Sequence, residues 1–144
     1  QESGRVSTIA CSVLDPAWAE QVKVRGKMLF IIEGLTMYMK ADEVRTMLAI
    51  IRDHFDNAYV CMETLCPYFV KKENIEKSIQ ATGATFTWGA NSFADLGNIA
   101  AGFRKVKDDN IARGMETLNP IYKLVMWMPI VHKFAEKILV FEKA

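Results

Sequence analysis

The chain has 144 residues, of which 51% are hydrophobic and 24% are charged, and its formal net charge is +1. This composition predicts one folded domain with a buried core and excludes an intrinsically disordered chain. The sequence has no basic stripe for nucleic acid and no apolar run of the roughly 18 residues that a membrane span needs. We therefore expect neither nucleic acid nor a membrane among its partners.

Apolar runs and helical stripes alternate along the chain. They predict, in order, a strand over 6–13, a short helix over 18–24, a strand over 27–33, a helix over 41–55, a strand over 57–65, a weaker helix over 68–82, an extended segment over 84–90, a short helix over 93–99, a strand over 102–109, a helix over 120–134 kinked near Pro129, and a strand over 137–143. This alternation predicts a mostly parallel α/β sheet with helices on both faces.

Three cysteines, Cys11, Cys61 and Cys66, form no disulfide framework. An odd count in a methionine-rich chain predicts a reducing, cytoplasmic location. Cys61 and Cys66 have no second pair and no histidine close by in sequence, which favours two half-buried strand residues over a metal site. We therefore predict no bound metal.

The most apolar predicted strand, 27–33, ends on a carboxylate, Glu33. In open α/β sheets ligands bind beyond the carboxyl ends of the strands, so Glu33 is expected at such a rim. Gly34 would let the backbone or a ligand approach closely. A carboxylate there suits a cationic or hydroxyl-bearing ligand; the alternative is a glutamate that pairs with a nearby lysine or caps a loop. Position alone does not decide between them.

Three short motifs resemble the leucine carboxyl methyltransferase family, and more closely its polyketide O-methyltransferase (TcmP-like) branch. That family typically shows S-x-L/F-D-x-x-W, then an apolar strand ending E-G-x-x-M-Y, and later an aromatic-Trp-Gly turn. The chain has SVLDPAW at 12–18, EGLTMY at 33–38 and FTWG at 86–89. The resemblance covers nearly the whole chain.

The resemblance implies methyl transfer from S-adenosylmethionine to a small molecule, a polyketide-like phenol or carboxylate, on a class I methyltransferase sheet with strand order 3-2-1-4-5-7-6. It implies that Glu33 contacts the cofactor and that Ser12 and Val13 flank its adenine, with Gly34 beside them. The protein-methylating branch has an acid where this chain has Ser12, which points away from that branch.

The resemblance begins at the third strand of that order, and no G-x-G turn for the cofactor occurs in the sequence. Because the chain also starts at Gln1, we expect 1–144 to be a single partial domain, the C-terminal part of a Rossmann-like methyltransferase domain containing strands 3 to 7. Cofactor binding should then be weak or absent, and the chain inactive by itself. The strand 27–33 would become an exposed edge, which predicts a homodimer through that edge, with exchange of 6–13 as one route.

Residues for the methyl acceptor are less defined. Tyr38, Trp127 and His132 are candidate contacts, because aromatic side chains make adaptable apolar walls, but ordinary core packing explains them as well. His54 is expected to be solvated, so no catalytic base is identified. Two other classes stay open: a non-catalytic association or regulatory α/β module, and an unrelated α/β domain in which the E-G-x-x-M-Y match arose by chance.

Overall fold

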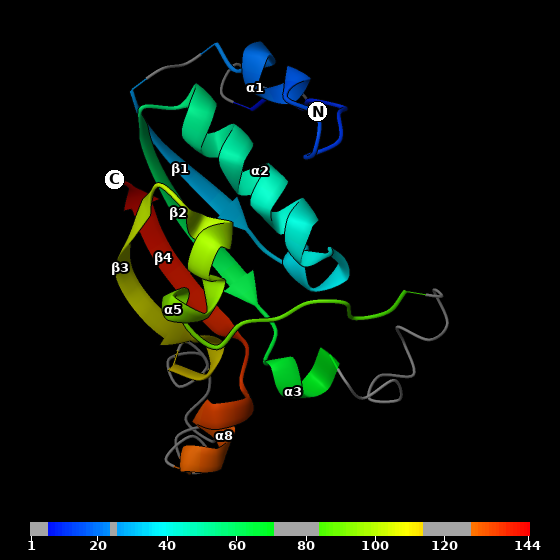
Figure 1. Ribbon diagram of the computed structural model, residues 1–144, viewed down its shortest axis with the longest axis vertical. Coiled ribbons are helices and arrows are strands. Elements are labelled where there is room, and N and C mark those ends of the chain that lie inside the picture. Colours follow the sequence, from blue (N-terminus) through cyan, green and yellow to red (C-terminus); the bar gives the residue numbers. More distant parts are fainter. Residues whose placement is uncertain (1–5, 24–25, 71–83, 114–127) are drawn as a thin grey trace.

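The computed structural model describes residues 6–23, 26–70, 84–113 and 128–144. Its centre is a four-stranded sheet in the order β1-β2-β4-β3 (Figure 1). The strands are β1 (Lys27–Ile32), β2 (Asn57–Thr64), β3 (Phe103–Asn110) and β4 (Lys137–Lys143). Each lies within about two residues of its predicted position. β1, β2 and β4 are apolar runs of a length that favours strands, whereas β3 is largely charged and has only Phe103 and Val106 as apolar residues.

The sheet is mixed. β1 and β2 are parallel, whereas β4 runs antiparallel to both of its neighbours, β2 and β3. Of the four described strands, β1, β2 and β3 run in the same direction and β4 is reversed, so the prediction of a mostly parallel sheet is confirmed in part: it holds for strand direction, but two of the three strand pairings are antiparallel. Alternation of strands and helices indicates how many elements there are, but it does not reveal whether a connection crosses over the sheet or returns beside the previous strand. The first residue of β4, Lys137, lies opposite the last residue of β3, Asn110, so β4 runs back beside β3.

Five helices and two 3-10 turns accompany the sheet in the described segments: α1 (Ala17–Gln21), α2 (Ala41–His54), α3 (Pro67–Val70), α5 (Phe93–Leu96), α8 (Pro129–Phe134), η1 (Thr36–Tyr38) and η2 (Gly97–Ala100). α2 confirms the predicted 41–55 helix, and Glu43 caps its start by accepting a 2.6 Å hydrogen bond from the Lys40 N–H. None of these helices has the length and apolar character needed to cross a membrane.

Several predicted elements differ. The segment 6–13 is not a strand: Val6 forms an isolated bridge and most of the segment is exposed. The sheet ends at β1, and a β-rich run becomes a strand only when another strand pairs its backbone groups. The segment 84–90 is irregular. α8 starts at Pro129, with Met128 extended, instead of being kinked there. Residues 71–82 of the predicted helix 68–82 and residues 120–127 of the predicted helix 120–134 lie outside the described residues.

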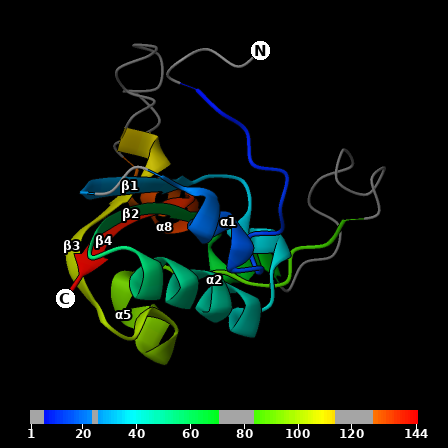
Figure 2. The same ribbon diagram turned by 90° about the horizontal axis from the view of Figure 1, so that it is seen from above.

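The core lies on one face of the sheet, which α1, α2 and α5 cover (Figure 2). On this face Val60, Met62, Leu139 and Phe141 are completely buried. The opposite face is different, since Leu29 is 62% exposed and Ile31 is 69% exposed. Among the described residues, the helices that pack on the sheet are thus on one face, and the expectation of helices on both faces is not met there.

An aromatic cluster attaches the N-terminal segment to this core. Trp18 stacks on Phe55 with ring centroids 5.8 Å apart, and its edge meets Phe30 at 6.1 Å. Phe55 is 2% exposed at the end of α2. The cluster places α1 beside the outer strand β1, where the candidate site lies.

Candidate functional site

The carboxyl ends of β1 and β2 meet at one edge of the sheet, because the two strands are parallel. An open groove of about 340 Å³, here called the β1 groove, runs along β1 at this edge. Its walls include Val13, Trp18, Leu29, Ile31, Leu35 and the carboxylate of Glu33. Apolar walls with one charged group are typical of small-molecule sites, and the volume is at the low end of their range.

The SVLDPAW motif builds one wall of the β1 groove. The indole N–H of Trp18 donates a 3.1 Å hydrogen bond to the main-chain oxygen of Val13, and the carboxylate of Asp15 accepts a 2.9 Å hydrogen bond from the Ala17 N–H. These local bonds turn the chain so that Val13 faces the groove. Ser12 is not among the lining residues; its hydroxyl accepts a 3.2 Å hydrogen bond from the Leu14 N–H. The structure therefore brings Val13 and Glu33 together and leaves Ser12 aside.

A second carboxylate holds the turn that follows Glu33. The N–H of Gly34, which has φ +62°, donates a 2.7 Å hydrogen bond to Glu63 Oε2. The Thr36 hydroxyl donates a 2.7 Å hydrogen bond to the main-chain oxygen of Glu63. Thr36 is fully buried and Glu63 is 8% exposed. The Gly34 donor is thus engaged by the protein, and the carboxylate that remains exposed at this rim is Glu33.

Glu63 was missed by the sequence reasoning, although the same signal pointed to it. It stands near the end of β2, just as Glu33 follows the end of β1. An acid at the carboxyl end of an apolar strand therefore occurs twice, once exposed and once buried. Within the described residues, the buried Glu63 has the structural role that was the alternative for Glu33, namely holding a loop.

The EGLTMY and FTWG motifs meet at this edge, about 50 residues apart in sequence. The Thr87 N–H donates a 2.8 Å hydrogen bond to the Met37 oxygen, and its hydroxyl donates one of 2.8 Å to the Met39 oxygen. A side chain at Gly89 would overlap the main-chain carbonyl of Leu65, which explains why a glycine stands there. The two motifs thus form one packed layer beyond β1 and β2.

Of the candidate acceptor contacts, Tyr38 belongs to this layer. Its ring is 41% exposed and lies 5.5 Å from the Phe86 ring, but it is not among the residues that line the β1 groove. Trp127 lies outside the described residues. His132 lines a different cleft, of about 230 Å³, together with Asn91, Asp108, Asn110, Arg113 and Lys137. The structure thus does not bring Tyr38 and His132 together at the β1 groove.

The cleft at His132 contains a buried lysine. Lys137 is 8% exposed and donates hydrogen bonds to the main-chain oxygens of His132 at 2.6 Å and Lys133 at 3.1 Å, at the end of α8. Burial lowers the pKa of Lys137, and the neighbouring Cys66 opposes this shift. His132 Nδ1 lies 3.3 Å from the Asn110 side-chain oxygen. These contacts fix α8 against the ends of β3 and β4.

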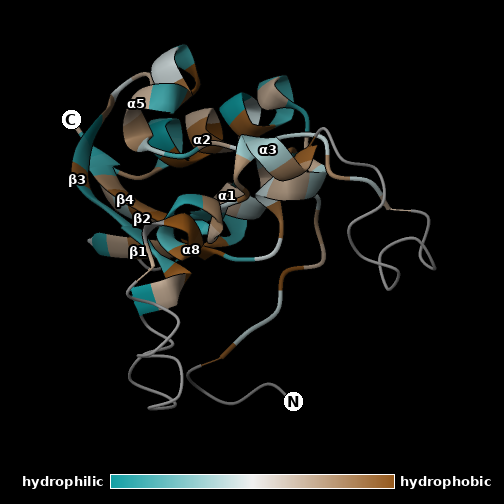
Figure 3. Ribbon diagram, turned by 90° about the horizontal axis from the view of Figure 1, so that it is seen from below, coloured by the Kyte–Doolittle hydropathy of each residue, from teal (hydrophilic) through white to brown (hydrophobic). Residues whose placement is uncertain are grey.

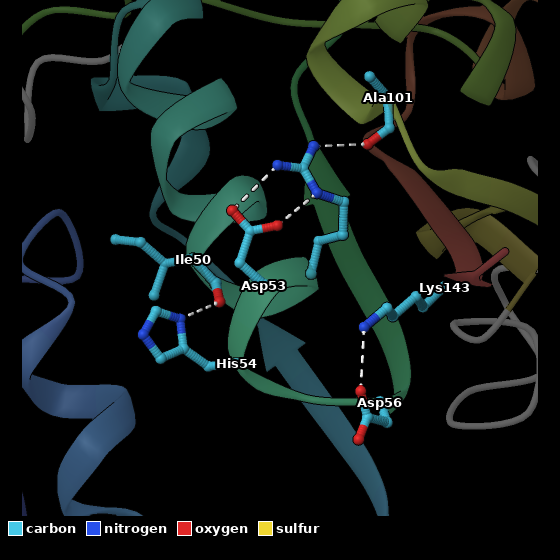
Figure 4. A network of polar contacts seen from close by, with 7 residues as sticks. Ile50, Asp53, His54, Asp56, Ala101 and Lys143 are labelled. Carbon is cyan, nitrogen blue, oxygen red and sulfur yellow. Dashed lines mark hydrogen bonds and ion pairs between the residues drawn. The ribbon is translucent and has the colours of Figure 1, made fainter.

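His54 is the last residue of α2, just before β2 begins, and so lies at the amino ends of the strands, away from the β1 groove (Figure 4). It is exposed, as predicted, and its Nδ1 is 3.0 Å from the Ile50 carbonyl. The polar contacts around it are structural: Arg52 pairs with Asp53 and donates a 3.0 Å hydrogen bond to the Ala101 oxygen. In the described part of the chain no three potential metal ligands lie together, and the cysteines there are free.

These observations define an α/β protein with a mixed sheet. An apolar groove with one exposed carboxylate, that of Glu33, lies at the carboxyl end of its edge strand β1. The chain is similar to the tetracenomycin polyketide synthesis O-methyltransferase TcmP of Streptomyces glaucescens, with 28% identity over 96 residues. The match covers 67% of this chain and 36% of TcmP, so it spans about a third of that protein. No family model and no solved structure matches the chain. The similarity supports at most a relationship with methyltransferases.

Proposed function

We propose that this chain is the C-terminal part of an S-adenosylmethionine-dependent O-methyltransferase that acts on a small molecule, a polyketide-like phenol or carboxylate. The observation that carries the proposal is the strand order β1-β2-β4-β3. If β1 is strand 4 of a class I methyltransferase sheet, this order is 4-5-7-6, the second half of the order 3-2-1-4-5-7-6. The partial similarity to TcmP supports the same assignment.

In this proposal the β1 groove is one wall of the cofactor site. Glu33 offers a negative charge that suits the sulfonium or amino group of the cofactor, and the apolar side chain of Val13 suits an adenine ring. The fit is partial, because the sequence contains no G-x-G turn to hold the methionine part. The chain by itself should therefore bind the cofactor weakly or not at all.

When bound, S-adenosylmethionine supplies an electrophilic methyl group. The contribution of this chain is alignment and exclusion of water: Glu33 would orient the cation, and the apolar wall from Leu29 to Leu35 would keep solvent away. Tyr38 is exposed beyond the same edge and is proposed to contact the acceptor. His132 lines another cleft and is the weaker of the described acceptor candidates. No residue is assigned as a base.

Calorimetric titration with S-adenosylmethionine tests the proposal on two proteins: the chain alone, and the chain joined to the segment that precedes it in its gene. We expect micromolar binding only for the longer protein. Losing one charge-assisted hydrogen bond corresponds to roughly 10- to 100-fold in affinity, so Glu33→Gln in the longer protein should weaken binding by about that factor. Glu20→Gln, an exposed glutamate on α1, is the matched control and should leave the affinity unchanged.

Two results would contradict the proposal. Micromolar binding by the chain alone would show that the groove is a complete site of its own. Unchanged affinity of Glu33→Gln in the longer protein would remove Glu33 from the cofactor site.

A further inference from the structure

The two outer strands of the sheet differ in how well they are protected against pairing with other chains. β3 has an irregularity between Lys105 and Lys107 and carries a row of charges, and it is mostly hydrophilic in Figure 3. Bulges and charges of this kind prevent edge-to-edge association. β1 pairs with β2 in regular register along its whole length and exposes Leu29 and Ile31. The β1 edge is therefore the unprotected one.

The side chains along β1 form a self-complementary row. Residues two apart in a strand share a face, so Lys27, Leu29, Ile31 and the following Glu33 project away from the face that packs on α2. The row reads positive, apolar, apolar, negative. Lys27 and Glu33 are both exposed, and within the described segments neither forms an ion pair.

A second copy matches this row when its β1 runs antiparallel with Phe30 opposite Phe30. Lys27 then lies opposite Glu33 of the second copy, and Leu29 lies opposite Ile31. Both ends of the pairing gain an ion pair, and the centre gains apolar contacts. A parallel, in-register pairing would instead place like charges opposite each other, which is unfavourable.

We propose that two copies of this chain associate through β1 in this antiparallel register, forming a two-fold symmetric dimer with one continuous eight-stranded sheet. Among the described residues no strand lies beside the outer backbone groups of β1, so the pairing would satisfy these groups and bury Leu29 and Ile31. It requires no exchange of the segment 6–13, which is not a strand. This inference concerns residues 1–144 by themselves; in the longer protein of the proposed function, strand 1 of the order 3-2-1-4-5-7-6 would pair with β1 and take the place of the second copy. Because β1 of the second copy would occupy the β1 groove, dimerisation and ligand binding in that groove exclude each other.

Sedimentation equilibrium of the chain over a wide concentration range tests the proposal. Wild type is expected to show a reversible monomer–dimer equilibrium. Lys27→Glu places two glutamates opposite each other at both ends of the pairing, and Glu33→Lys does the same with lysines. Each variant should raise the dimer Kd by about tenfold or more, since two attractive pairs become repulsive. The double reversal Lys27→Glu with Glu33→Lys restores opposite charges and should return the Kd to within about threefold of wild type.

Val106→Lys is the matched control, because Val106 is also an exposed apolar residue, 50% exposed, but on the opposite edge strand β3. It should not change the Kd. Circular dichroism of each variant checks that the fold is retained. The proposal is overturned if wild type remains monomeric at all concentrations, if the double reversal is as weak as the single variants, or if Val106→Lys disrupts the dimer as strongly as Lys27→Glu.

Discussion

The hydrogen bond from Thr36 to β2 provides a sharp test of how the rim around Glu33 is held. Thr36 is fully buried, and its hydroxyl donates to the main-chain oxygen of Glu63 at 2.7 Å. Thr36→Val keeps the shape of the side chain and removes only this donor, so no cavity contributes. The bond itself accounts for about 0.5–1.5 kcal/mol, and a buried carbonyl that loses a partner adds to this. We expect a loss of about 1–2 kcal/mol in the free energy of unfolding.

The assay is urea denaturation at fixed protein concentration, supported by thermal melts, in which this loss corresponds to a fall in Tm of about 3–8 °C. Thr46→Val is the matched control. Thr46 also donates to a main-chain oxygen, that of Asp42 at 2.9 Å, but it is exposed on α2. The control should change the free energy by less than about 0.5 kcal/mol. Equal effects of the two substitutions would refute the idea that Thr36 anchors the turn.

Three further changes test the packing at and around the site. Gly89→Ala should lower the free energy of unfolding by about 1–3 kcal/mol in urea titrations, because the added methyl group would displace the Leu65 carbonyl. Phe55→Ala should lower it by about 3–5 kcal/mol, and in a background in which Trp88 and Trp127 are replaced by phenylalanine it should shift the Trp18 emission toward the red, because the indole loses its stacking partner. For Lys137, burial holds the pKa below 10.5, so the unfolded chain binds more protons than the folded one just below that pH. The stability of wild type relative to Lys137→Met should therefore rise as the pH increases toward 10.5.

Each of these has a control and a contrary outcome. Gly97→Ala has open space around the added methyl group, so its loss reports the backbone conformation, φ +49° and ψ −126°, that favours glycine and not a steric overlap. An unchanged free energy of unfolding for Gly89→Ala would contradict the steric argument. In the same background without Trp88 and Trp127, Phe86→Ala removes a ring that packs against Tyr38 and should leave the Trp18 emission unchanged. Lys133→Met removes an exposed lysine; a pH dependence equal to that of Lys137→Met would exclude Lys137 as the source.

The sequence located the elements whose formation depends on neighbours in the chain. α2 matches its prediction because one apolar stripe and an acidic first turn are local properties. β1, β2 and β4 match because each is a short apolar or β-rich run between turn signals, whereas β3 matches with only Phe103 and Val106 as apolar residues. Glu33 could be placed at the end of β1, beside the site, for the same reason.

Pairing between distant segments was decided by the tertiary structure. The segment 6–13 has the residues of a strand, but apart from the bridge at Val6 no strand lies beside it in the described part of the chain, so there its backbone groups join no ladder. The reversed direction of β4 depends on where its chain re-enters the sheet. The role of Glu63 became visible only because β1 and β2 are adjacent, which brings Gly34 to its carboxylate. Local patterns determine whether a segment is suited to a strand or a helix, whereas partners, directions and buried hydrogen bonds depend on contacts between residues far apart in the chain.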